Sequence, residues 1–154
     1  MKKLMFILFT LFMLTGCGTV SDLPAYGSLV NGGLPGFTFN VETCTGNAEA
    51  RRVNVTILIS HRLEAQEITL MGGDQTFATN HLGTRFQVSY AGGQSSLLVA
   101  TGVQKKVNLE VWGVTPNTDA FTLVSCRIKA VDKDDDSNEK ITALQFRNVP
   151  IVWQ

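Results

Sequence analysis

The sequence is poor in the residues that carry acid–base, metal and redox chemistry. Its 154 residues include only two histidines, His61 and His81, and three cysteines. Nucleophilic hydrolysis needs a nucleophile, a base and an orienting group, and a zinc site needs several ligands at suitable spacing. Neither histidine lies in such a motif. We therefore expect His61 to end a strand and His81 to lie in a loop, with no cofactor, no metal centre and no enzymatic activity.

Neither sign of charge dominates. The chain has 13 basic and 13 acidic residues, and they are mixed along the sequence rather than gathered into a basic stripe. A protein that binds nucleic acid through its phosphates normally shows such a stripe. The composition therefore predicts that nucleic acid is not a partner.

Long apolar runs are also absent, apart from one at the N-terminus. Lys2 and Lys3 precede an apolar stretch of eleven positions, from Leu4 to Leu14, interrupted by Thr10. A membrane-spanning helix needs roughly 20 apolar residues, whereas a short run behind a cationic start is typical of a secretory signal. We expect residues 1–16 to be a signal peptide that is removed.

The end of this run, Leu14-Thr15-Gly16-Cys17, resembles the bacterial lipobox. The resemblance implies that Cys17 becomes the first mature residue and is acylated, palmitate included, and that the protein is a lipoprotein held on a membrane. Each buried methylene of the acyl chains would add roughly 0.8 kcal/mol. In such lipoproteins Gly18, rather than Asp, implies sorting to the outer membrane, facing the periplasm or the surface. The alternative is an ordinary signal peptide that contains a cysteine.

The remaining chain divides into a tether and one domain. Removing residues 1–16 from the 154 leaves 138 residues, enough to bury a single core. Residues 17–36 are rich in Gly, Ser and Pro without periodicity, which predicts a flexible tether. The domain is expected to span residues 37–154.

The domain shows the period of β-strands and no segment of ten or more residues with the period of a helix. Gly, Asn and Asp turns separate seven to nine short strands, which predicts an all-β, antiparallel β-sandwich. Pro150 is expected at a strand end, an edge or a bulge because it cannot donate to a ladder. The expected strands lie within 37–41, 53–60, 68–70, 77–79, 85–90, 97–100, 107–112 and 124–130, and residues 140–146 and 149–153 together supply the last one.

The segment Phe77 to Val88, FATNHLGTRFQV, follows an apolar strand and resembles the small immunoglobulin-like domains of bacterial secreted lipoproteins. The resemblance implies an immunoglobulin-like sandwich and brings no catalytic residue with it. Fold alone does not give a function.

Cys44 and Cys126 remain once Cys17 is assigned to lipid. In an oxidising compartment an even pair predicts a disulfide, here one that would join an early strand to a late one. The alternative is two separate buried thiols. Neither cysteine has a Cys-x-x-Cys partner or a nearby basic group that would activate it.

The acidic run from residue 132 to 139 is the one weak candidate for a metal. Asp132, Asp134, Asp136 and Asn138 alternate as in the early part of a calcium loop. However, Ser137 and Ala143 stand where an EF-hand needs Gly and Glu. A solvated loop is the expectation, with weak calcium binding as its alternative.

Trp112 falls on the polar side of its strand, so it is expected either to be exposed at the edge of the sandwich and to contact a partner or to pack under the turn at 115–117.

From these features we expect a non-enzymatic binding or scaffolding module at the bacterial cell envelope, with an envelope protein as partner. The alternative is an inhibitor or immunity-type lipoprotein that blocks an envelope enzyme with the loop of Gly92, Gly93, Gln94 and Ser95. An enzyme such as a cell-wall hydrolase is a third, less supported reading, because its acid and base cannot be named.

Overall fold

A computed structural model describes residues 29–31, 33–93, 95–131 and 139–154. In this part of the chain the regular structure is almost entirely strand, with one 3-10 turn, η1 (Ala91–Gly93), and no α-helix. None of the described residues forms a helix that could cross a membrane. The strands are β1 (Leu29–Asn31), β2 (Phe37–Asn47), β3 (Arg52–His61), β4 (Gln66–Met71), β5 (Phe77–Thr79), β6 (Arg85–Tyr90), β7 (Ser96–Val99), β8 (Lys105–Trp112), β9 (Ala120–Val131), β10 (Glu139–Pro150) and β11 (Val152–Trp153).

Alternation of apolar and polar residues explains why these segments are strands. In β3 every second residue from Val53 to His61 is buried, and the residues between them are partly exposed. One face of the strand therefore lies in the core and the other meets solvent, as a period of two requires. The strands expected from the sequence are confirmed, including β5 and β6 with their hairpin loop.

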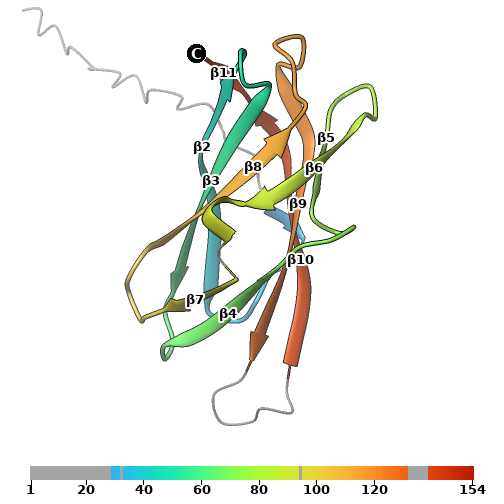
Figure 1. The fold of residues 1–154 in the computed structure, drawn as a ribbon. Helices are drawn as coiled ribbons and strands as arrows, with labels where there is room; N and C mark the ends of the chain where they lie inside the picture. Colours follow the sequence, from blue (N-terminus) through green and yellow to red (C-terminus); the bar gives the residue numbers. More distant parts are fainter. Residues whose placement is uncertain (1–28, 32, 94, 132–138) are drawn as a thin grey trace, which may run out of the picture.

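The strands form two packed layers of an immunoglobulin-like β-sandwich (Figure 1). One layer runs in the order β11-β2-β3-β8-β6. The other contains β1, β10 and β9, with β4 and β5 paired to successive parts of β9, and with β7 beside β4. Pairing between β5 and β6 joins the layers, and all the named pairs are antiparallel except β11 with β2. The sequence pattern predicts seven to nine strands; β1 and the two-residue β11 raise the number.

The space between the layers is filled by one apolar cluster. Its largest fully buried side chains come from both layers, for example Phe121 and Phe146 from one and Ile57 and Leu109 from the other. Burying side chains of this size stabilises the fold by roughly 1.5–3 kcal/mol each. The inner faces of both sheets are therefore used for packing, and only their outer faces, edges and loops remain for binding.

Thr76 joins the strands where β9 changes partner. The β5 pairing of β9 ends at Ser125 and the β4 pairing begins at Arg127. The buried Thr76 hydroxyl accepts a hydrogen bond from the Arg127 amide (3.1 Å) and donates one to the Met71 carbonyl (2.7 Å). It thus satisfies backbone groups that the sheet itself leaves without a strand partner.

Replacing Thr76 with valine, which has the same shape, should lower the free energy of unfolding by about 2 kcal/mol because a buried N–H loses its acceptor. The matched control is Thr56→Val, since the Thr56 hydroxyl donates to Asn108 on the exposed face of β3. That control should change stability by less than about 0.5 kcal/mol. Urea denaturation of both variants measures the difference, and equal values would contradict the assigned role of Thr76.

The folded body begins earlier than the sequence indicates. We expect a flexible tether from residue 17 to 36, but Leu29–Asn31 pair with β10 as strand β1, and Leu34 is buried in the core. Gly and Pro around this short strand hide its period. The part of the proposed tether that lies before β1, including Cys17, is outside the described residues.

The expected disulfide between Cys44 and Cys126 is not present in the structure. Both are buried free thiols. Cys44 lies in β2, which approaches β10 across the core, and Cys126 lies one strand further, in β9. A disulfide needs Cβ atoms about 3.8 Å apart. Alternation places both side chains on inner faces but does not set which strands lie opposite each other.

Candidate functional site

The outer face of the β2-β3-β8-β6 layer carries an exposed tryptophan. Trp112 is the last residue of β8 and retains 45% of its surface. Of the two expectations for this side chain, exposure is therefore correct. β8 lies between β3 and β6 in the sheet, and Trp112 stands at its end, paired with Arg52 of β3, one residue beyond the last β6 pair at Val111.

Neighbouring polar side chains hold the ring in place. The Arg52 guanidinium carbon lies 5.3 Å from the ring centroid, and Arg52 Nη1 lies 3.3 Å from Glu110 Oε1. On the other side, Trp112 Nε1 donates a hydrogen bond to Ser89 Oγ at 3.3 Å. This partly exposed ion pair contributes less than about 1 kcal/mol, so its main effect is to orient the arginine. We call Arg52, Ser89, Glu110 and Trp112 the Trp112 surface.

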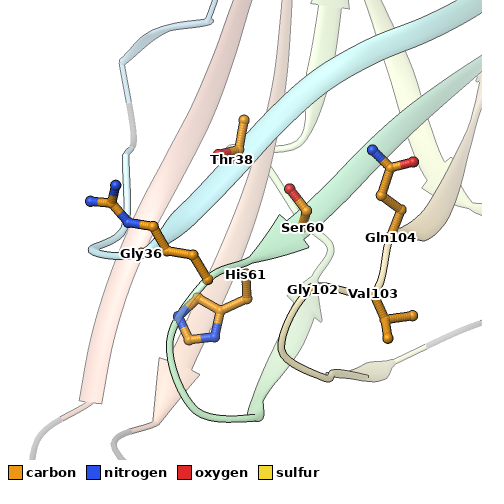
Figure 2. Close-up of a pocket in the computed structure, with 8 residues that line it drawn as sticks. Gly36, Thr38, Ser60, His61, Gly102, Val103 and Gln104 are labelled. Carbon is orange, nitrogen blue, oxygen red and sulfur yellow. The ribbon is translucent and has the colours of Figure 1, made fainter.

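A second feature is an open depression of about 650 Å³ at the far end of β3. We call it the His61 depression. Figure 2 shows the side chains of Thr38, Ser60 and Gln104 along one side of it, with the His61 ring at the end of the strand. The residues that line it are Gly36, Thr38, Ser60, His61, Arg62, Gly102, Val103 and Gln104.

His61 itself is almost completely buried, with 4% of its surface exposed. It is the last residue of β3, as the sequence predicts, and its ring stacks on Phe37 with 4.0 Å between ring centroids. Its carbonyl accepts a hydrogen bond from the Gly102 amide at 2.9 Å. Neither ring nitrogen has a hydrogen-bond partner among the described residues.

The remaining candidate residues are placed as follows. His81 is exposed in the loop between β5 and β6, as expected. Gly92, Gly93 and Ser95 are exposed between β6 and β7, and the Ser95 carbonyl accepts a hydrogen bond from the Leu70 amide at 2.8 Å. Gln94 and the acidic candidates Asp132, Asp134, Asp136 and Asn138 lie outside the described residues. Within the described ranges, no three His, Cys, Asp or Glu side chains gather as metal ligands would.

The two described cysteines are poor nucleophiles. Burial raises the pKa of the Cys44 thiol to about 12 and has the same effect on the pKa of Cys126. A thiol reacts as the thiolate, so both should be inert at neutral pH while the protein is folded.

Comparison with known proteins adds little beyond the fold class. No protein-family model and no curated protein matches the chain. Among solved structures, one similar chain is the ASH / PapD-like domain of human CEP192 (PapD-like domain 7), with 8% identity and a TM-score of 0.42 over 75% of this chain and 83% of that chain. The chain is an immunoglobulin-like β-sandwich.

Proposed function

We propose that this protein is a non-enzymatic, lipid-anchored binding or scaffolding module of the bacterial cell envelope, and that a protein partner docks on the Trp112 surface. The observation that carries the proposal is the exposed tryptophan clamped between Arg52 and Ser89. Tryptophan and arginine are the residues most enriched among those that dominate binding energy at protein interfaces.

The geometry supports docking on this surface for two reasons. The Trp112 ring is already held by Arg52 and Ser89, and its backbone is paired with β3, so it loses little freedom when a partner covers it. The charged groups beside it are already paired with each other, which lowers the cost of removing water from them. The lipid anchor in this proposal rests on the four residues that end at Cys17.

Replacing Trp112 with alanine should weaken partner binding by at least about 30-fold, equivalent to roughly 2 kcal/mol, with little change in stability. A photo-crosslinking amino acid at Asn108, on the same outer face, should capture the partner in living cells. The same probe at exposed Arg147 in β10, in the other layer, is the control. Crosslinks that persist in Trp112→Ala, or that are stronger from position 147, would contradict the surface assignment.

The anchor needs a separate test. Cells given a palmitate analogue should label the wild-type chain, and Cys17→Ala should abolish the label. An unlabelled wild-type chain would refute the lipoprotein part of the proposal and leave the docking part standing. Turnover of a substrate by the purified protein would refute the non-enzymatic part.

A further inference from the structure

Strand β6 extends the outer surface around Trp112 toward the other layer. From Val88 onward β6 pairs with β8, and up to Gln87 it pairs with β5, so it passes from one layer to the other (Figure 1). Val88 is buried and Phe86 packs against the core. Alternation therefore puts Arg85, Gln87 and Ser89 together on the outer side of β6.

An aromatic side chain stands at each end of this outer row. Ser89 accepts the hydrogen bond from the indole of Trp112 at 3.3 Å. Four residues earlier, the guanidinium carbon of Arg85 lies 3.9 Å from the centroid of the Phe77 ring. At about 3.3 Å per residue, Arg85 is roughly 13 Å from Ser89 along the strand. A standard protein interface covers about 800 Å² on each partner, so a single partner can contact both ends of the row.

The two arginines of this surface differ in charge balance. Arg52, beside Trp112, is paired with the carboxylate of Glu110 at 3.3 Å. Arg85 is exposed, and no carboxylate of the residues that the structure places forms an ion pair with it. Contact with the Phe77 ring does not use up the N–H donors of the guanidinium, which match the two oxygens of a carboxylate.

We propose that the protein that docks on the Trp112 surface also reaches Arg85 and presents an aspartate or glutamate side chain to it. This inference rests on the docking proposed above and adds the chemistry of the partner, which carries an acidic group on Arg85 and an apolar group on Trp112. Phe77 is a positioning residue, because its ring holds the Arg85 side chain against β5 and so lowers the entropy lost on binding.

The photo-crosslinking residue at Asn108 tests this inference in variants of Arg85. Arg85→Gln should weaken binding at least about tenfold, seen as a loss of crosslinked partner in living cells. Arg85→Lys keeps the charge but not the paired donors, so it should give an intermediate loss. The matched control is Arg147→Gln, which removes the same charge from another exposed arginine without an ion pair in the described part of the chain. This control should leave the crosslink unchanged.

A charge exchange then identifies the carboxylate. With the crosslinking residue moved to Gln87, which is exposed between Arg85 and Ser89, the captured partner peptide is sequenced by mass spectrometry and should include an aspartate or glutamate. Replacing that acid with arginine should weaken binding to the wild-type chain and restore binding to Arg85→Glu. A purely structural role of Arg85 would not produce this rescue.

The docking proposal and this inference fail in different ways. A crosslink from Asn108 that is absent, or that persists in Trp112→Ala, contradicts the docking and this inference with it. A crosslink that is lost in Trp112→Ala but kept in Arg85→Gln leaves the docking standing and overturns the inference. Equal losses in Arg85→Gln and Arg147→Gln would show a general effect of charge, and a failed charge exchange would show that no carboxylate meets Arg85. Either result also overturns it.

Discussion

Above pH 9 the free energy of unfolding should fall by up to about 2.7 kcal/mol per pH unit, because each of two buried thiols contributes about 1.36 kcal/mol per unit. The pKa of Cys44 and that of Cys126 rise from 9.0 to about 12 on folding, through burial. Below pH 9 both thiols are protonated in the folded and unfolded chain, so the stability is complete. Between pH 9 and 12 only the unfolded chain ionises, and unfolding is favoured.

Tyr90 should steepen the loss at still higher pH. Its pKa is also raised, first by burial and then by its proximity to Cys126. The Tyr90 hydroxyl donates hydrogen bonds to the Arg127 carbonyl (2.9 Å) and the Met71 carbonyl (3.3 Å), and these are lost when the phenol ionises. The same sign applies, since ionisation is easier in the unfolded chain.

Urea denaturation at a series of pH values, in a Cys17→Ala background, measures this dependence. Cys44→Ala and Cys126→Ala should each reduce the slope above pH 9 by about half. In parallel, a thiol reagent at pH 8 should label both cysteines only in denaturant. An unchanged slope in both variants would contradict the contribution assigned to the buried thiols, and thiols that appear only after reduction would show that the pair forms a disulfide in solution.

Replacing Gly46 with alanine should cost about 3 kcal/mol, because it forces extra volume into a packed contact. Gly46 is a buried residue of β2, and a side chain there would lie 2.3 Å from Cε3 of Trp153 in β11. The Trp153 ring is fixed because its Nε1 donates to the Thr118 carbonyl at 2.9 Å. The Gln154 amide also donates to the Gly46 carbonyl at 2.9 Å, so displacement of the ring should release β11.

A double-mutant cycle isolates this contact. In a Trp153→Leu background the alanine at position 46 should cost at least about 1 kcal/mol less than in the wild type, because the ring that it would meet is gone. Gly72→Ala is the control, since open space surrounds Gly72 and its φ is not in the left-handed region. Additive effects of the two substitutions would show that Gly46 is not constrained by Trp153.

Local sequence pattern determined most of the strands. In β3 and β8 apolar residues alternate with polar ones, and this period fixes both the strand and the face that is buried. The β5–β6 hairpin is equally local, because Asn80 accepts hydrogen bonds from the amides of Leu82 and Thr84 within its own loop. The same alternation in β8 predicts that the Trp112 side chain faces solvent.

Tertiary structure alone decided which strands lie opposite one another and which polar groups find partners. β1 is a strand only because β10 offers an edge to it. Cys44 and Cys126 are both buried, as their parity predicts, but remain free thiols. The roles of Gly46 and Thr76 depend on Trp153 and Arg127, which are distant in sequence. The His61 depression likewise joins residues from three separate segments. A periodic pattern specifies the face of a strand, whereas contacts between layers depend on the twist, stagger and order of all the strands together.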